Sequence, residues 1–222
     1  MEEQLPVAQK VVRVCAAQLP TIHGQFEMTI YHDGTGQEHV CLSMGDLKGD
    51  PLLIRVHSEC LSGDVFGSVR CDCRDQLTRA LTSISAAGRG ILIYLRQEGR
   101  GIGLTNKIQA YALQDEGLDT VDANLHLGLP VDDRSYAIAA EILVDQGVSK
   151  VRLLTNNPHK VCELRQGGIE VERVPHEATP RDENRVYLRT KADRLGHLLH
   201  VTACPATLTE SAPTATGGNK AQ

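Results

Sequence analysis

A strand–helix–strand pattern near the end of the chain places the strongest limit on its fold. KVRLLT at 150–155 is a short apolar run, NPHKVCELRQGG at 157–168 has helical spacing, and IEVERVP at 169–175 is again typical of a strand. Two strands joined through a helix pair in parallel, because the connection returns to the starting end of the sheet. The chain is therefore expected to contain a parallel segment of sheet.

The beginning of the chain has a different pattern. Residues 10–45 alternate between polar and apolar positions, and turn signals such as Asp33-Gly34 separate the strand-like runs. This pattern predicts a hairpin within a small antiparallel meander. The apolar runs at 51–58 and 91–97 predict two short buried strands. The fold class is therefore expected to be mixed α/β (α+β), with N-terminal antiparallel strands followed by alternating strands and helices around a mixed sheet.

Helical periodicity predicts the helices, and composition predicts the limits of the folded domain. Apolar residues recur at helical spacing at 73–88, 102–117, 135–147 and 184–199. We expect one folded domain over 10–200, a flexible N-terminus at 1–9, and a disordered tail at 201–222, which is rich in Ala, Thr, Pro and Gly.

Composition argues against several classes of partner. The net charge of −5 is unlike that of a protein that covers duplex phosphate, and five Tyr, two Phe and no Trp offer few platforms for stacked bases. No stretch approaches about 18 apolar residues, and the acidic N-terminus lacks the apolar core of a signal peptide. We therefore expect no nucleic acid, no membrane, and a cytoplasmic location, where thiols stay reduced.

Three of the seven cysteines, Cys60, Cys71 and Cys73, are spaced C-x10-C-x-C. An odd total in a reducing compartment is unlike a disulfide framework. Cys71 and Cys73 bracket one residue where a turn enters a helix, so both thiols can reach one metal, and Cys60 at a strand end can join them. Three thiolates leave a fourth position for water, as in catalytic zinc sites, but the spacing alone leaves a structural site equally open.

A zinc ion held by three thiolates is negatively charged overall, so such a site needs a base or a cation close by. His57, Glu59 and later acidic residues are candidates from the sequence. The other cysteines are expected to be inert: Cys15, Cys41 and Cys162 as small buried side chains on apolar faces, and Cys204 in the tail.

His57-Ser58-Glu59 matches the H-x-E half of the motif of zinc nucleobase deaminases. The other half of that motif, P-C-x-x-C, is absent from the sequence. Deamination is therefore the second enzyme hypothesis. It shares the attack of metal-activated water on a ring carbon of a nucleobase.

Longer stretches are more specific than the cysteine spacing. They are RVHSECLSGDVFGSVRCDCRDQL at 55–77, RQEGRGIGLTNKIQAYALQDEGLDTVDAN at 96–124, LGLPVDDRSY at 127–136, LLTNNPHK at 153–160 and TKADRLGHLL at 190–199. Together they resemble the signatures of the GTP cyclohydrolase II family over most of residues 10–200. The resemblance implies opening of the guanine imidazole ring of GTP with release of formate and diphosphate. The remaining diaminopyrimidinone ribosyl phosphate would enter riboflavin biosynthesis.

The resemblance also implies a ligand set for the substrate and the metals. Cys60, Cys71 and Cys73 would bind one zinc ion per subunit, and magnesium would accompany the substrate phosphates. The residues that would contact GTP are Arg55, Val56, His57, Ser58, Glu59, Gln76, Glu98, Gly99, Arg100, Thr120, Thr155 and Lys160. Arg74 stands where the family usually has glycine, and we expect it to face solvent.

Three further residues would take part in the chemistry. Tyr111 would assist the zinc-dependent water chemistry at guanine C8 and at the formamide produced. The resemblance implies that Asp132 is a proton acceptor and that Arg134 is the nucleophile that attacks the α-phosphate. A guanidinium has no free lone pair, so charge neutralisation on the phosphates is the conservative role for Arg134.

The resemblance implies a homodimer as well. The chain lacks the synthase domain of bifunctional relatives, so we expect the cyclohydrolase reaction alone. A third hypothesis is that the protein is not an enzyme but a regulator that binds GTP without catalysis and holds a structural zinc.

Overall fold

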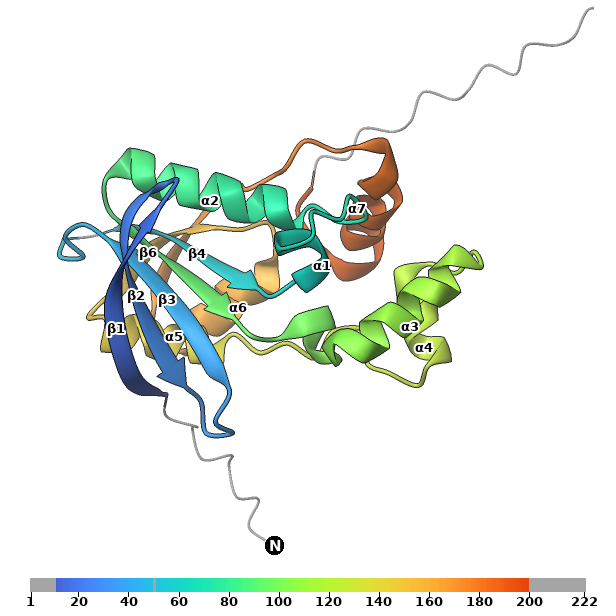
Figure 1. Ribbon diagram of the computed structural model, residues 1–222, viewed down its shortest axis with the longest axis horizontal. Coiled ribbons are helices and arrows are strands. Elements are labelled where there is room, and N and C mark those ends of the chain that lie inside the picture. Colours follow the sequence, from blue (N-terminus) through green and yellow to red (C-terminus); the bar gives the residue numbers. More distant parts are fainter. Residues whose placement is uncertain (1–10, 50, 200–222) are drawn as a thin grey trace, which may run out of the picture.

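The computed structural model describes residues 11–49 and 51–199. The predictions for the N-terminus at 1–9, for the tail at 201–222 and for Cys204 lie outside these residues. The described chain forms one seven-stranded mixed sheet in the order β1-β2-β3-β5-β4-β6-β7 (Figure 1). The expected mixed α/β class is confirmed.

The N-terminal half of the sheet is the predicted meander. Strands β1 (Val12–Thr21), β2 (Gly24–His32) and β3 (Glu38–Met44) pair in antiparallel order. The predicted hairpin connection lies between β2 and β3, where the Asp33 carboxylate accepts hydrogen bonds from the backbone N–H groups of Thr35 and Gln37. These hydrogen bonds are formed within the loop itself and hold its two ends together.

The other half of the sheet is parallel, as the strand–helix–strand pattern predicts. It contains β4 (Leu52–Ser58), β5 (Gly90–Leu95), β6 (Lys150–Leu154) and β7 (Glu170–Val174). Strand β5 joins the two halves, because it pairs with β3 in antiparallel order and with β4 in parallel. The carboxyl ends of the parallel strands therefore meet at one edge of the sheet, where ligands of open α/β sheets bind.

Helices cover both faces of the sheet. Helix α2 (Cys73–Ala87) packs Ala80 and Ile84 against Phe26 and Leu92 on one face. Helices α5 (Ala137–Asp145) and α6 (Pro158–Gln166) cover the other face and complete the larger apolar core. This three-layer core fixes the strand ends in space, because every central strand is clamped from both sides.

The remaining helices gather beyond the carboxyl ends of the parallel strands (Figure 1). They are α1 (Leu61–Asp64), η1 (Glu98–Gly101), α3 (Gly103–Asp115), α4 (Thr120–His126) and α7 (Asp182–Leu195). Helix α4 was not predicted, although its N-cap is visible in the sequence: the Asp119 carboxylate accepts from the N–H groups of Val121 and Asp122, each at 2.8 Å. None of the helices within residues 11–49 and 51–199 is long and apolar enough to cross a membrane.

The prediction that three lone cysteines are buried is correct only for Cys41, whereas Cys15 and Cys162 are exposed. Cys15 lies on β1, which is an edge strand with most of its side chains exposed. Cys162 lies on α6 away from the apolar core. Apolar neighbours in the sequence are therefore not sufficient evidence that a cysteine is covered by another layer of the fold.

Acid should weaken this fold through His176, which follows β7 and is buried. Its Nε2–H donates to the carbonyl of Gln76 at 2.9 Å, and burial lowers its pKa to about 3. The unfolded chain takes up a proton near pH 6.5, whereas the folded chain does not until about pH 3. Stability is therefore lost as the pH falls through this window, by about 2 kcal/mol at pH 5 from this one group.

Urea unfolding at pH 7.5 and pH 5 measures the effect. Because other histidines also contribute, the informative comparison is with His176→Gln. That variant should be less stable at pH 7.5 but should lose about 2 kcal/mol less on acidification than the wild type. An equal loss in both proteins would contradict the role of His176.

Candidate active site

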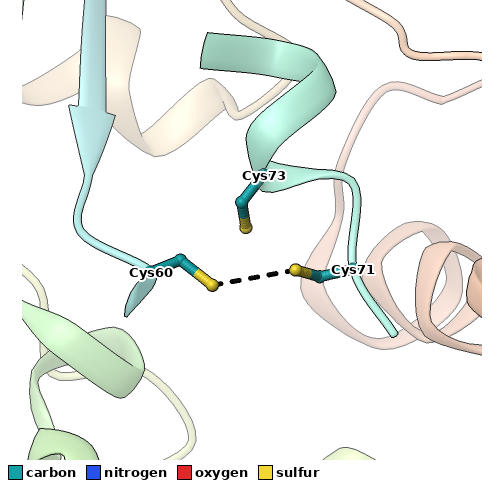
Figure 2. Close-up of side chains that lie close together, drawn as sticks. All are labelled: Cys60, Cys71 and Cys73. Atoms are coloured by element: carbon teal, nitrogen blue, oxygen red, sulfur yellow. Dashed lines mark hydrogen bonds between the residues drawn. The ribbon is translucent and has the colours of Figure 1, made fainter. Parts of the chain in front are cut away.

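Three thiols meet at the carboxyl edge of the sheet. Cys60 follows β4 directly, and Cys71 and Cys73 lie where the chain enters α2. Their sulfur atoms all lie within 4.8 Å of one another, and the Sγ atoms of Cys60 and Cys71 are 3.7 Å apart. Figure 2 shows the three side chains pointing toward a common centre from these segments. The cysteines predicted as metal ligands are thus brought together.

The geometry fits a metal that prefers thiolates. Zinc–sulfur bonds of about 2.3 Å at tetrahedral angles place sulfur atoms about 3.8 Å apart, close to the 3.7 Å between Cys60 and Cys71. The backbone also leaves room for the cluster at Gly63. A Cβ atom there would lie 2.7 Å from the Cys71 sulfur and 3.2 Å from the Cys60 sulfur.

The three thiols differ in pKa. The pKa of Cys60 lies well below its usual value, because Cys71 and Cys73 donate hydrogen bonds to its sulfur and Lys107 is close. The hydrogen bond to Cys60 raises the pKa of Cys71 to about 11, and the pKa of Cys73 is raised as well. The surroundings of Cys60 therefore favour its thiolate, the form that binds metals.

Lys107 on α3 is the cation beside this thiolate. Its ammonium lies 3.2 Å from the Cys60 sulfur and 2.7 Å from Oε1 of Glu98. Burial by itself would lower the pKa of Lys107, but the bond to Glu98 and the charge of Cys60 outweigh it and raise the pKa. Lys107 was not among the residues predicted from the sequence. Its signal was the i, i+4 spacing to Tyr111, which places both on one helix face.

Tyr111 lines the same space as the thiols. The Arg70 guanidinium carbon lies 5.0 Å from its ring centre, and the Lys107 ammonium lies 5.7 Å away. Burial raises the pKa of Tyr111 to about 12. The phenol therefore stays protonated at neutral pH and is available as a hydrogen-bond donor.

Asp64 organises the loop that carries Cys60, and it too was missed. Its carboxylate accepts from the backbone N–H of Cys60 at 3.0 Å and from the Tyr94 hydroxyl at 2.9 Å, and it pairs with His57 Nε2 at 3.0 Å. The His57 ring is stacked on Tyr94 and is only 2% exposed. His57 therefore reaches the thiol cluster through Asp64.

Two adjoining cavities form one cleft here. They share Ser58, Cys73, Arg134 and Tyr187 as lining residues. The thiol end also holds these predicted residues: Glu59, Glu98, Gly99, Arg100, Tyr111 and Thr120. The opposite end holds the others: Arg55, His57, Gln76, Thr155 and Lys160.

Two predicted residues do not line the cleft. Val56 is fully buried in the apolar core, and its carbonyl accepts a hydrogen bond from Lys160 at 2.8 Å. The Asp132 carboxylate is bound to the Arg134 guanidinium through two hydrogen bonds, one of 2.7 Å from Nε to Oδ1 and one from Nη2 to Oδ2. Arg74 is exposed, as expected.

The end away from the thiols is strongly cationic. Burial and the nearby charges of Arg55 and Arg134 hold the pKa of Lys160 well below its usual value. At the thiol end, both terminal nitrogens of Arg100 are buried without a hydrogen-bond partner among the described residues. A bound polyanion would stabilise cations held together in this way, because it replaces their lost hydration and offsets the repulsion between them.

Helix α7 borders this end through Tyr187 and Lys191, which were not among the site residues predicted from the sequence. Lys191 is paired with the buried Asp72, between the two neighbouring cysteines, at 2.7 Å. Asp72 also accepts from Gln76 Nε2 at 2.6 Å, and Gln76 accepts from Arg55 at 2.5 Å. Tyr187 of the same helix lines both cavities. The network ties α7 to the turn that carries the thiols.

Comparison with known proteins adds independent information. Residues 12–175 match the sequence model of the family described as GTP cyclohydrolase II. A GTP cyclohydrolase-2 from Neisseria meningitidis serogroup A is 53% identical over 188 residues, which cover 84% of this chain and 95% of that protein. A GTP cyclohydrolase-2 from serogroup C of the same species is 51% identical and covers 87% and 99%, respectively.

Longer relatives match over the same region. The riboflavin biosynthesis protein RibBA of Bacillus cytotoxicus is 56% identical over 186 residues, which cover 82% of this chain but 47% of that protein. The chain thus spans about half the length of the RibBA relatives that it matches. The match to the family model ends at residue 175, before α7, whereas the two GTP cyclohydrolase-2 relatives match over 188 and 195 residues.

Proposed function

The chain belongs to the GTP cyclohydrolase II family, and on this premise we propose that it hydrolyses GTP in the cleft at the carboxyl edge of its sheet. The reaction opens the imidazole ring of guanine and releases formate and diphosphate. The product, a diaminopyrimidinone ribosyl phosphate, enters riboflavin biosynthesis. The observation that carries the proposal is the convergence of three thiols at one end of a cleft whose other end is cationic.

The two ends of the cleft suit the two ends of GTP. The purine lies at the thiol end, where Tyr111 offers an O–H donor and Glu59, held by Arg96 at 2.9 Å, offers a carboxylate. A carboxylate there can accept the N1–H and the 2-amino group of guanine, whereas adenine would leave it unpaired. Cys60, Cys71 and Cys73 would hold a zinc ion, which would supply the Lewis acid for hydrolysis.

The phosphates lie along the cationic wall. Lys160, Arg134 and Arg55 supply positive charge there, and Thr155 lies at the end of β6 beside them. Magnesium would accompany the phosphates, with water and phosphate oxygens as most of its ligands. Asp132 holds Arg134 in a bidentate pair, so the guanidinium faces the phosphates as a fixed cation. We therefore assign Arg134 the stabilisation of charge rather than nucleophilic attack.

A single incubation tests the proposal. The zinc-loaded protein is mixed with GTP and magnesium, and formate, diphosphate and ammonia are measured together. Release of formate and diphosphate in equal amounts is the expected result. Ammonia without formate would indicate deamination instead, and GTP binding without any product would indicate a silent regulator.

Replacing Arg100 with glycine should weaken GTP binding without weakening the fold. Arg100 has a φ of 61°, a strained value for a residue with a side chain, and the two terminal nitrogens of its guanidinium have no hydrogen-bond partner among the described residues. Glycine relieves the strain, so unfolding in urea should require the same free energy or up to about 1 kcal/mol more. Loss of the charged hydrogen bonds to GTP should raise its Kd about 10–100-fold.

Calorimetric titration and urea unfolding measure the two effects. The matched control is Arg152→Ala, which removes an exposed arginine from β6, outside the cleft. The control should bind GTP like the wild type. Unchanged GTP affinity in Arg100→Gly would remove Arg100 from the substrate site.

The homodimer and the cytoplasmic location remain predictions of the family resemblance and of the sequence. Sedimentation of the purified chain tests the first. For the second, reduced thiols in the cytoplasm would suit three cysteines that must bind a metal as thiolates.

A further inference from the structure

We propose that Lys107 is a positioning residue for the metal: its ammonium donates a hydrogen bond to the Cys60 thiolate and offsets the negative charge of the three-thiolate site. The inference rests on the proposed metal-dependent function, and it extends that function to a residue outside the ligand set. It also answers the need for a nearby cation that three thiolates create.

The charge balance of the site requires such a group. Three thiolates and one divalent ion together carry a net negative charge, and Cys60 and Cys71 are each only 7% exposed. A buried uncompensated charge is strongly unfavourable. Among the hydrogen bonds that the structure places on the Cys60 sulfur, only the one from Lys107, at 3.2 Å, comes from a cation.

The Glu98 carboxylate fixes the position of Lys107 and also binds the segment that carries Cys60. Glu98 accepts the Lys107 ammonium on Oε1 at 2.7 Å and the backbone N–H of Leu61, the residue after Cys60, on Oε2 at 2.6 Å. The same carboxylate therefore holds the lysine and the segment that presents the thiolate. Both Glu98 and Lys107 are about 10% exposed, so water screens the pair weakly.

A purely structural role predicts a different behaviour. If Lys107 only neutralised Glu98, its removal would change stability and leave the bonding of the metal to sulfur unaltered. If it acts on the thiolate, its removal raises the energy of the sulfur lone pairs, because a hydrogen bond from a cation stabilises them. The electronic spectrum of the metal site separates the two.

The experiment uses protein loaded with cobalt(II), whose sulfur-to-metal charge-transfer band reports on the thiolates. In Lys107→Met the band should move to lower energy, and in Lys107→Arg, which keeps the charge, it should stay near the wild-type position. Iodoacetamide should alkylate Cys60 of the zinc-loaded Lys107→Met protein about tenfold faster than the wild type. The control, Lys150→Met, removes an exposed lysine paired with Glu170 and should match the wild type in both assays.

A band and an alkylation rate like those of the wild type in a folded Lys107→Met protein would overturn the proposal. Should that variant fail to fold because Glu98 is left unpaired, the double variant Lys107→Met/Glu98→Gln removes both charges, and the same two readouts decide. Formate release by the wild type is assayed separately. A wild type that binds cobalt but releases no formate contradicts the proposed function, whereas an unshifted band contradicts only the role of Lys107.

Discussion

Replacing Gly63 with alanine is expected to lower the affinity for zinc about 100-fold while leaving the rest of the fold in place. The new methyl carbon would lie 2.7 Å from the Cys71 sulfur and 3.2 Å from the Cys60 sulfur. Atoms that are not bonded to each other do not approach so closely, so at least one ligand must move away from the metal. The backbone of Gly63 is not in the left-handed region, so steric contact alone causes the loss.

Competition with a chelator measures the zinc affinity, and circular dichroism checks the fold. The control is Gly36→Ala in the hairpin loop, where φ is 82° and a Cβ meets nothing within 4 Å. That variant should lose some stability through backbone strain and none of its zinc affinity. Wild-type zinc affinity in Gly63→Ala would mean that the three sulfurs do not bind the metal in this arrangement.

Replacing Arg134 with alanine should reduce the rate of product formation by about 100- to 1000-fold. Arg134 lines both cavities, and Asp132 holds its guanidinium through two hydrogen bonds. Burial would lower the pKa of Arg134, but the bonds to Asp132 raise it above its usual value. The guanidinium therefore remains charged, which suits charge stabilisation and opposes nucleophilic attack. Removal also leaves the Asp132 carboxylate without its arginine partner.

Arg134→Lys separates the two roles. Lysine keeps the charge but loses the bidentate geometry, so turnover should fall less than in the alanine variant. Rapid quenching with labelled GTP tests for an adduct between protein and nucleotide, and we expect none in either protein. A trapped adduct in the wild type that is absent from Arg134→Lys would restore the nucleophilic role, and undiminished diphosphate release in Arg134→Ala would exclude both roles. Arg152→Ala is the matched control for loss of an arginine.

Local patterns in the chain were sufficient for the order and kind of most elements. Alternation predicted the antiparallel meander, and the strand–helix–strand segment at 150–175 predicted the parallel half, because period and connectivity are local properties. Helix α4 was missed, since its seven residues are too short for a periodic signal. Cys15 was misplaced because the burial of a strand face depends on whether another layer covers it.

The sequence by itself also indicated the three thiols as candidate ligands and, through the family resemblance, most of the residues that line the cleft. The cysteines and the motifs around them lie close together in the sequence, and several of the predicted substrate contacts lie at or directly after the carboxyl ends of β4 and β6. Only the tertiary structure decided which groups act on those ligands. Lys107 and Asp64 reach Cys60 from α3 and α1, and Lys191 reaches Asp72 across 119 residues. Such contacts depend on how separate elements pack, because a hydrogen bond requires distances of about 3 Å that no local pattern specifies.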